Sequence, residues 1–363
     1  MTPLYSIEIH SHIRNYTAEI HTDYNFLDQL SALPQHALLV DKNVYELYRE
    51  IIDPRFSKDK IFIFEATENN KTFESAGEIY TWLITNFSAK RNLNFISIGG
   101  GITLDVSGFV ASTLYRGINW YYVPTTLLAQ VDSCIGSKTS LNFKQFKNLL
   151  GTFYPPHKIF INPDFHKTLS DLDRSSGLGE IIKFLLMEGL EKGDISGIAG
   201  RMQKITDSQS NLAEVICDCL NIKRSFMEND EFDTGRRNLL NYGHCFGHAL
   251  ESASNYYVPH GVAVNIGIIF AGIAAVQRKT LSAEDMQFIT REICMPFLVQ
   301  EQRPADYDAE VLLNNLKNDK KRIGNGLPLV YPVQNGLSKI LDLSEEEFRS
   351  ALAVLKSILF ENR

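Results

Sequence analysis

The feature that most constrains this chain is a change of sequence rhythm near residue 165. Before that point, runs rich in β-branched and aromatic residues alternate with helical stretches. The strand-like runs are 5–12, 36–43, 60–66, 93–101, 119–126 and 158–165, and the helical stretches between them are 45–53, 73–90 and 106–117. Such alternation predicts an α/β layer built on a largely parallel sheet.

Beyond residue 166, apolar residues recur with a helical period over longer runs. We expect helices over 176–190, 210–229, 236–254, 262–278, 283–294, 308–318 and 345–360, with a short hairpin at 327–341 as the exception. The two rhythms together predict an N-terminal Rossmann-like α/β domain at 1–165 and a C-terminal helical domain at 166–363. The cleft between two such domains is the default place for an active site.

Composition and charge narrow the class of protein. The 363 residues are 44% hydrophobic and 22% charged, which is typical of a globular chain with a sizeable core. A net charge of −7 argues against nucleic acid or a membrane surface as the main partner. The N-terminus lacks the organisation of a signal peptide, the apolar stretch 262–276 is short and carries Asn265, and five cysteines form no pair motif. We therefore expect a cytoplasmic protein with reduced thiols and no membrane span.

A run of three glycines suggests a nucleotide site. Gly99, Gly100 and Gly101 follow an apolar strand and open a predicted helix, where the backbone can approach a pyrophosphate. The run is not GxGxxG, so the standard dinucleotide fingerprint is absent. Three other predicted strand ends offer polar residues at the same sheet edge, namely Asp41 with Asn43, Glu68 with Lys71, and Thr125 with Thr126. Four agreeing strand ends favour a nucleotide site over a simple tight turn.

Histidines and one carboxylate suggest a metal site. His244 and His248 are four residues apart, the spacing with which one helix offers two imidazoles to one ion. No Glu follows His244, so the HExxH pattern of metalloproteases is absent. Glu180, in an apolar helix, and His260 complete a pool from which two His and one Glu would form a catalytic zinc set. Spacing does not decide which two of the three histidines bind.

Cations and amides beside these motifs suggest an anionic substrate. Arg237 and Asn241 precede His244 at helical spacing, so we expect 237, 241, 244 and 248 to share one helix face. Lys138, Lys147 and Lys183 are flanked by small, aromatic or apolar residues rather than by other charges, as expected for lysines that converge on a phosphorylated ligand. Lys223 and Lys321 also lie near the motifs, although 320–322 is a charge run that reads equally well as a solvated face.

The chain resembles the 3-dehydroquinate synthase family, and more broadly the sugar phosphate cyclases, across nearly its whole length. The segments that carry the resemblance are GGGITLDVSGFVASTLYRG, VPTTLLAQVDSCIGSKT, KNLLGTFYPP, SGLGEIIK, RRNLLNYGHCFGHALE and HGVAVNIG. The chain departs from the usual family pattern at Phe146, Ser137, Asp233, Cys245 and Val262. These changes flank expected ligands without removing one, so they bear on efficiency or exact substrate rather than on class.

The resemblance implies two cofactors, NAD and one divalent metal ion (zinc or cobalt). It assigns NAD contacts to Asp41, Glu68, Lys71, Gly99, Gly100, Gly101, Asp105, Thr125 and Thr126, with Lys138 and Lys147 beside them. It assigns the metal to Glu180, His244 and His260. Substrate contacts fall to Asp132, Lys138, Lys147, Asn148, Lys183, Lys223, Arg237, Asn241, His248 and Lys321. The family is also dimeric, and Arg116 would reach the neighbouring subunit's site.

The resemblance also implies a reaction, the conversion of 3-deoxy-arabino-heptulosonate 7-phosphate into 3-dehydroquinate with elimination of phosphate, in the shikimate pathway. NAD would act as a recycled catalyst in this lyase reaction. Close alternatives are cyclases that make valiolone-type or 2-deoxy-scyllo-inosose-type rings, although Asn241 and His248 favour the dehydroquinate member. A metal-dependent polyol dehydrogenase and a non-catalytic NAD-binding relative are the more distant alternatives.

Overall fold

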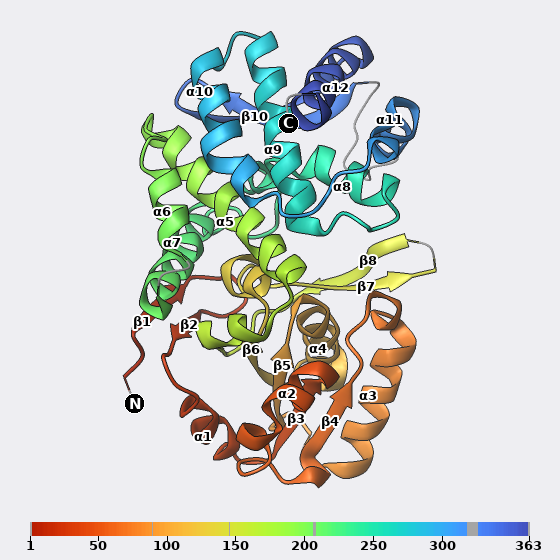
Figure 1. Cartoon of the computed structure of the whole chain (residues 1–363). Helices are drawn as coiled ribbons and strands as arrows, with labels where there is room; N and C mark the ends of the chain where they lie inside the picture. Colours follow the sequence, from red (N-terminus) through yellow and green to blue (C-terminus); the bar gives the residue numbers. More distant parts are fainter. Residues whose placement is uncertain (1, 89, 145, 206–207, 318–325, 362–363) are drawn as a thin grey trace. The chain divides into compact units, whose positions relative to one another are not determined.

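A computed structural model describes residues 2–88, 90–144, 146–205, 208–317 and 326–361 (Figure 1). The chain divides into two compact units, Met1–Leu169 with Leu212–Phe232, and Ser170–Asn211 with Asp233–Arg363. The expected division at residue 165 lies four residues before the first of these breaks. Leu212–Phe232 returns to the first unit, and the sequence gives no signal of that return because 210–229 has the same helical period as its neighbours.

The first unit is built on a seven-stranded sheet with the order β1-β2-β9-β6-β5-β3-β4. Its strands are β1 (Tyr5–Ile9), β2 (Tyr16–Ile20), β3 (His36–Asp41), β4 (Ile61–Phe64), β5 (Asn94–Gly99), β6 (Asn119–Pro124) and β9 (Lys158–Ile161). Only β1 pairs antiparallel, with β2, and every other pair in the sheet is parallel. The predicted parallel α/β sheet is therefore confirmed, while strand β2 was not predicted.

Helices cover both faces of this sheet. They are α1 (Phe26–Ser31), α2 (Lys42–Ile52), α3 (Phe73–Asn86) and α4 (Gly101–Thr113). Leu38, Val40, Ile96 and Ile98 point to one face and form a core with Phe26 of α1 and other apolar residues of that side. All residues of β3 and β5 are buried, which is expected for central strands of a parallel sheet covered on both sides.

Three further elements of the first unit carry candidate site residues. They are the π-helix η4 (Ala129–Ser133), the hairpin of β7 (Lys138–Phe143) with β8 (Phe146–Phe153), and helix α7 (Gln209–Met227). The hairpin was not predicted from the sequence. On β7, Thr139 and Leu141 are buried while Lys138, Ser140 and Asn142 are more exposed, so these last three residues share one face of the strand.

The second unit is mainly helical. Its helices are α5 (Asp171–Lys192), α6 (Ile198–Lys204), η6 (Arg236–Asn241), α8 (His244–Ala253), α9 (His260–Gln277), α10 (Ala283–Phe288), η7 (Ile289–Cys294), η8 (Met295–Phe297), η9 (Pro304–Tyr307), α11 (Ala309–Lys317) and α12 (Glu345–Phe360). The predicted hairpin is confirmed as β10 (Leu327–Val333) and β11 (Gly336–Leu343). Within the described residues, α9 alone has the length and apolar composition of a membrane span, and 83% of it is buried inside the protein, as in a core helix.

The prediction of one continuous helix over 236–254 is wrong. Arg237 and Asn241 lie on the short 3₁₀ helix η6, and α8 begins only at His244. Gly243 between them has a left-handed backbone, with φ at +76°, which interrupts the helix. A Cβ atom at Gly243 would also lie 2.5 Å from the carbonyl oxygen of Val264, so the break lets helix α9 pass close to this backbone.

Candidate active site

The glycine turn lies where the strand order of the first unit reverses. The chain passes from β3 outward to β4, and then returns to β5 on the other side of β3 before continuing to β6 and β9. Gly99 ends β5 and α4 begins at Gly101, so the N-terminus of a 13-residue helix opens at this point. Open α/β sheets bind their ligands at such a switch point, and a helix N-terminus favours an anion.

The glycine turn is tightly packed against Tyr122 and Thr126. The hydroxyl of Tyr122 donates to the carbonyl oxygens of Gly99 and Gly100, at 3.0 Å each. A Cβ atom at Gly100 would lie only 2.9 Å from Cγ2 of Thr126, so a side chain there would displace that threonine. The turn therefore has no side chains that would shield its backbone, and this geometry lets a pyrophosphate approach closely.

Asp41, Thr125 and Thr126 lie at the same carboxyl edge of the sheet. Asp41 ends β3 and caps α2, because its Oδ1 accepts a hydrogen bond from the amide of Val44 at 3.1 Å. Burial raises the pKa of Asp41, although nearby backbone amides pull it down. The amide of Thr125 donates to the carbonyl of Gly99 at 3.0 Å, which fixes the end of β6 beside the glycine turn. These residues thus surround the turn on neighbouring strands.

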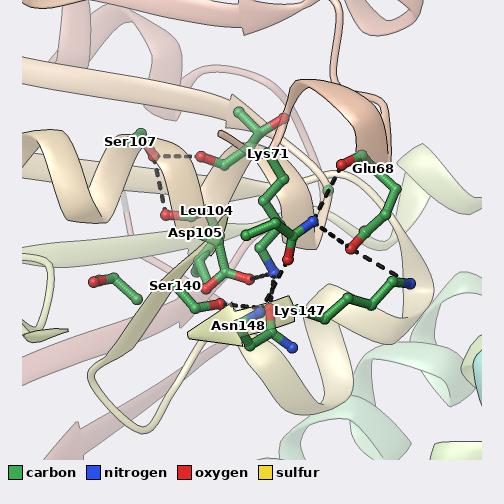
Figure 2. Close-up of polar contacts among 12 residues, drawn as sticks. Glu68, Lys71, Leu104, Asp105, Ser107, Ser140, Lys147 and Asn148 are labelled. Carbon is green, nitrogen blue, oxygen red and sulfur yellow. Dashed lines mark hydrogen bonds and ion pairs between the residues drawn. The ribbon is translucent and has the colours of Figure 1, made fainter. Parts of the chain in front are cut away.

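A polar network in the first unit joins Lys71 to helix α4 and to the hairpin (Figure 2). Nζ of Lys71 lies 2.5 Å from Oδ2 of Asp105 and donates to Oδ1 of Asn148 at 2.6 Å. Burial raises the pKa of Asp105, while the ammonium of Lys71 acts in the opposite direction. Ser140 also donates to Oδ1 of Asn148, at 2.9 Å. The expected NAD residues Lys71 and Asp105 and the expected substrate residue Asn148 are therefore in direct contact.

Asn142 is a further member of this network that sequence reasoning missed. Its side-chain amide donates to Oε1 of Glu68 at 2.9 Å, and its Oδ1 accepts from the amide of Asn148 at 2.9 Å. Its own backbone amide donates to the carbonyl of Lys71 at 2.8 Å. Lys147, also exposed, stands 3.5 Å from the same oxygen of Glu68. The alternation of Lys138, Ser140 and Asn142 along β7 was the signal that could have found Asn142.

Lys223 and Asp132 form a second polar group in the first unit. Nζ of Lys223, on α7, lies 2.5 Å from Oδ1 of Asp132 on the π-helix η4. The same ammonium donates to the carbonyl oxygens of Asp132 at 2.7 Å and Ile135 at 2.9 Å. A π-helical turn is frequent at functional sites, because the extra residue redirects a side chain. Lys138 follows shortly after, at the start of β7.

One expected residue of the first unit, Arg116, lies away from these groups. Arg116 is exposed and lies before β6, at the amino edge of the sheet and thus at the opposite edge from the glycine turn. Tyr115, Arg116 and Gly117 all have positive φ angles, of 52°, 64° and 116°. Such a loop is disfavoured for two non-glycine residues in succession and is typical of a constrained functional segment. Lys321 lies outside the described residues.

In the second unit, a helix crossing brings Glu180 to His260. Helix α5 meets the start of α9 at Gly179 and Gly261, where a Cβ atom on either residue would overlap the backbone of the other helix. The hydroxyl of Ser176 accepts a hydrogen bond from the amide of Gly261 at 3.0 Å and fixes the crossing. Glu180 directly follows Gly179, and His260 directly precedes Gly261. The close approach of the two helices therefore brings the side chains of Glu180 and His260 together.

Four potential metal ligands converge at this crossing. Oε1 of Glu180 lies 3.4 Å from Nε2 of His244 and 3.2 Å from Nε2 of His260. The ligand nitrogens of His244, His248 and His260 all lie within 4.8 Å of one another. Two ligands bound to zinc at 2.0–2.2 Å with tetrahedral angles stand roughly 3.3 Å apart. The spacing of Glu180, His244 and His260 therefore fits one such ion.

Glu180 supports the same interpretation. Its side chain is fully buried, and neither carboxylate oxygen accepts a well-aligned hydrogen bond from any described residue. The ammonium of Lys183 stands 2.5 Å from Oε2, which leaves Oε1 facing the two imidazoles. Lys183 balances the charge at Oε2, whereas Oε1 faces two imidazole nitrogens, which is the arrangement of a carboxylate that shares a metal ion with two histidines. The residues present therefore fit a divalent metal ion.

The two imidazoles nearest Glu180 are oriented through their other ring nitrogens. Nδ1 of His244 lies 3.1 Å from the carbonyl oxygen of Tyr242, and Nδ1 of His260 lies 3.2 Å from Oε2 of Glu251. Burial, together with the charge of Lys183 nearby, holds the pKa of His244 well below its ordinary value. Burial also lowers the pKa of His260, but its contacts with Glu180 and Glu251 outweigh this and raise it to about 10. Partners at Nδ1 are typical of metal-binding histidines, and Glu251 was missed in the sequence.

The remaining expected residues of the second unit are close in sequence to Glu180 or His244, and their side chains differ in exposure. Lys183 is buried beside Glu180, with its ammonium 4.2 Å from the ring centre of Phe184. Arg237 is buried on η6, and Asn241, on the same element, donates to the carbonyl of Asn238 at 2.8 Å. His248 is the more exposed histidine on α8, one turn after His244.

Comparison with protein families agrees with the sequence resemblance. The family model described as 3-dehydroquinate synthase N-terminal matches residues 61–176, and that described as 3-dehydroquinate synthase C-terminal matches residues 177–322. A 3-dehydroquinate synthase of Streptococcus pyogenes is 32% identical over 92% of this chain and 94% of its own length. One of Clostridium tetani is 42% identical over 64% of this chain and 62% of its own length.

Solved structures show the same fold at lower identity. A 2-deoxy-scyllo-inosose synthase complexed with carbaglucose-6-phosphate, NAD+ and Co2+ superposes with a TM-score of 0.81 at 22% identity, covering 98% of this chain and 99% of its own. A 2-epi-5-epi-valiolone synthase of Streptomyces hygroscopicus with NAD+ and Zn2+ bound has a TM-score of 0.77 at 23% identity, covering 94% and 97%. A probable glycerol dehydrogenase of Sinorhizobium meliloti has a TM-score of 0.60 at 14% identity, covering 95% and 97%.

Proposed function

The chain belongs to the 3-dehydroquinate synthase family, and we propose that the two groups of residues described above convert 3-deoxy-arabino-heptulosonate 7-phosphate into 3-dehydroquinate. The chain is accordingly an enzyme, a phosphate-eliminating lyase of the sugar phosphate cyclase type. The observation that carries the residue assignment is the convergence of Glu180, His244 and His260, because one carboxylate oxygen that faces two imidazole nitrogens at 3.2 and 3.4 Å is a ligand set typical of a catalytic zinc site. We propose these three residues as the metal ligands, with zinc or cobalt as the ion.

The first unit would hold NAD. The pyrophosphate would approach the bare backbone of Gly99, Gly100 and Gly101 at the N-terminus of α4, where the helix dipole favours negative charge. Asp41, Thr125 and Thr126 would contact the nucleotide from the neighbouring strand ends, and Glu68, Lys71, Asp105 and Lys147 from the network of Figure 2. NAD binding would therefore replace some of the contacts that these polar side chains make with one another.

The catalytic roles follow from charge and position. When bound, NAD takes up and returns a hydride, and a divalent metal lowers the pKa of a substrate hydroxyl. Lys138, Asn148 and Arg237 would grip the phosphate, and an arginine suits this task because its guanidinium binds phosphate bidentately. His248 would relay protons near the oxidised carbon. Asp132, Lys183, Lys223, Asn241 and Lys321 would orient the remaining substrate oxygens.

Assembly and location are also part of the proposal. We propose a cytoplasmic homodimer in which Arg116 serves the neighbouring subunit's site. The support is its place on an exposed loop of three left-handed residues at the amino edge of the sheet. An arginine at that edge would have no direct role at the glycine turn of its own sheet.

The proposal is tested by inorganic phosphate release. The purified protein, loaded with metal and catalytic NAD, is expected to release one phosphate per heptulosonate phosphate without net accumulation of NADH. Turnover only of sedoheptulose 7-phosphate or glucose 6-phosphate would instead assign a valiolone-type or inosose-type cyclase. Net NADH formation from a polyol, without phosphate release, would assign a dehydrogenase. NAD binding with no turnover of any of these compounds would assign a non-catalytic relative.

Lys138→Ala tests the substrate side. Removal of a phosphate-binding ammonium is expected to lower kcat/KM by roughly ten- to a hundredfold, since a charged hydrogen bond contributes roughly 1.5–3 kcal/mol. Because Lys138 also stands beside the expected cofactor residues, the dissociation constant for NAD is measured in parallel and is expected to change little. Lys144→Ala, in the turn that follows the same strand, is the matched control. Wild-type kcat/KM in Lys138→Ala would remove Lys138 from the site.

A further inference from the structure

The turn before Lys138 has an unfavourable backbone. Gly136 and Ser137 are successive residues with positive φ, of +116° and +63°. Glycine adopts such angles freely, whereas serine at +63° is disfavoured because its Cβ crowds the following carbonyl. Ser137 stands where the family usually has glycine. Other contacts must therefore hold this turn, which directly precedes a proposed phosphate-binding lysine.

Hydrogen bonds with three other described residues help to hold the turn. The amide of Gly136 donates to the hydroxyl of Tyr16 at 3.0 Å, and the amide of Tyr154 donates to the carbonyl of Ser137 at 2.6 Å. The third is made by the side chain that glycine would lack, since the hydroxyl of Ser137 donates to Oε1 of Glu231 at 3.3 Å. Ser137 and Glu231 are both buried, so this contact is shielded from water.

Glu231 is itself fixed by the N-terminal segment of the same unit. Its Oε1 accepts from the hydroxyl of Ser11 at 2.6 Å, and its Oε2 accepts from the amide of His12 at 2.7 Å. Glu231 follows α7, the helix whose Lys223 binds the carbonyl of Ile135. The segment from Asp132 to Ser137 is thus held at one end by Lys223 and at the other by Glu231.

We propose that Glu231 and Ser137 are positioning residues that hold the turn presenting Lys138 to the substrate. The inference rests on the proposed function for its effect on turnover. It goes beyond that function because it assigns a role to two residues that are not among the proposed cofactor or substrate contacts. The serine hydroxyl, through Glu231, supports a backbone that glycine would adopt without help.

Paired substitutions at Ser137 test the proposal. Ser137→Ala keeps the disfavoured backbone and loses the hydroxyl, so KM for the heptulosonate phosphate should rise about tenfold, as expected for one shielded hydrogen bond. Ser137→Gly removes the hydroxyl and the backbone penalty together, so KM should stay within about twofold of the wild type. Glu231→Gln should raise KM in the wild-type background and have a smaller effect when combined with Ser137→Gly.

Gln35 provides the matched control, because it is an exposed non-glycine residue of the same unit with φ at +48°. Gln35→Ala and Gln35→Gly should change the melting temperature at most and leave KM unchanged. Hydrogen exchange of peptides covering 132–143, read by mass spectrometry, reports the turn without any activity. Exchange should accelerate in Ser137→Ala and not in Ser137→Gly.

The outcomes separate the two proposals. A wild-type protein that releases no phosphate would overturn the proposed function, and hydrogen exchange would still decide whether Ser137 and Glu231 hold the turn. Equal exchange in Ser137→Ala and Ser137→Gly would overturn the positioning role. A KM for Ser137→Gly as high as that of Ser137→Ala would overturn it as well.

Discussion

The proposed NAD residues of the first unit come from strand ends, a short helix and a hairpin, whereas the proposed metal ligands of the second unit come from three helices. In the first unit the charged groups neutralise one another, as Lys71 does with Asp105. In the second unit Lys183 pairs in the same way with Oε2 of the buried Glu180, but Oε1 of the same carboxylate faces the imidazoles of His244 and His260. The first group is therefore satisfied before any ligand binds, while the second is arranged for a positive charge that the protein itself supplies only in part.

This difference has an energetic consequence. Ligand binding at the NAD residues must exchange protein contacts for cofactor contacts, so the net gain from each contact is small. Binding of a metal ion beside Oε1 of Glu180 would require little further desolvation, because this carboxylate is already buried. Substitutions in the second unit should consequently have larger effects than substitutions in the first.

Glu180→Gln is expected to have the largest effect. The amide lacks the negative charge that faces His244 and His260, so the variant should lose stoichiometric metal on dialysis, and kcat should fall by at least about a thousandfold. Metal content by elemental analysis is the direct measurement. Glu188→Gln on the same helix, where Glu188 forms a surface pair with Lys192, should keep its metal. A fully metallated, active Glu180→Gln variant would remove Glu180 from the ligand set.

Lys71→Met should have an intermediate effect that is confined to the first unit. Loss of the ammonium removes the contacts with Asp105 and Asn148 and should raise the dissociation constant for NAD by roughly ten- to a hundredfold, the range for charged hydrogen bonds. Metal content should be unchanged. The variant also leaves Asp105 buried without its cation, so adding Asp105→Asn should recover part of the lost thermal stability. Lys71→Met with wild-type NAD affinity would contradict the assignment.

A feature of this molecule could be predicted from the sequence where a local pattern or a family motif records it. The parallel sheet could be predicted from periodicity. Spacing supplied a pool of Glu180 and three histidines, and the family resemblance alone selected Glu180, His244 and His260 as the proposed ligands. The break at Gly243 could not be predicted, because it depends on how closely helix α9 approaches, which no local pattern records. Asn142 and Glu251 were missed for a related reason, since each acts through a contact with a residue of a different element, Glu68 in one case and His260 in the other.

Asn142→Ala tests one of these missed residues and should have a smaller effect. Asn142 links Glu68 to the hairpin, so its loss should raise the dissociation constant for NAD about three- to tenfold, as expected for neutral hydrogen bonds. Asn119→Ala is the matched control, because Asn119 donates to Asn94 at the amino edge of the same sheet. If both variants bind NAD equally well, the network of Figure 2 does not support the cofactor site.

The smallest expected effect concerns how the thermal stability of the first unit depends on pH. Burial, with the charge of Arg14 as a second cause, lowers the pKa of His157 to about 4, and burial also lowers that of His21. An unfolded histidine titrates near pH 6.5, so between pH 6.5 and 4 the unfolded chain binds more protons than the folded one. The contribution of His157 is therefore complete above pH 6.5 and is lost as the pH falls through 4.

The tryptophans make this measurable, because the two in the chain, Trp82 and Trp120, both belong to the first unit. Thermal unfolding followed by tryptophan fluorescence should show the melting temperature falling by a few degrees more in the wild type than in His157→Gln between pH 6.5 and 4. Glutamine can still accept the hydrogen bond that the amide of Trp120 donates to Nδ1 of His157 at 3.3 Å. His10→Gln, which removes an exposed imidazole from the same unit, should reproduce the wild-type curve. Parallel curves for the wild type and His157→Gln would show that acid acts on the first unit through other groups.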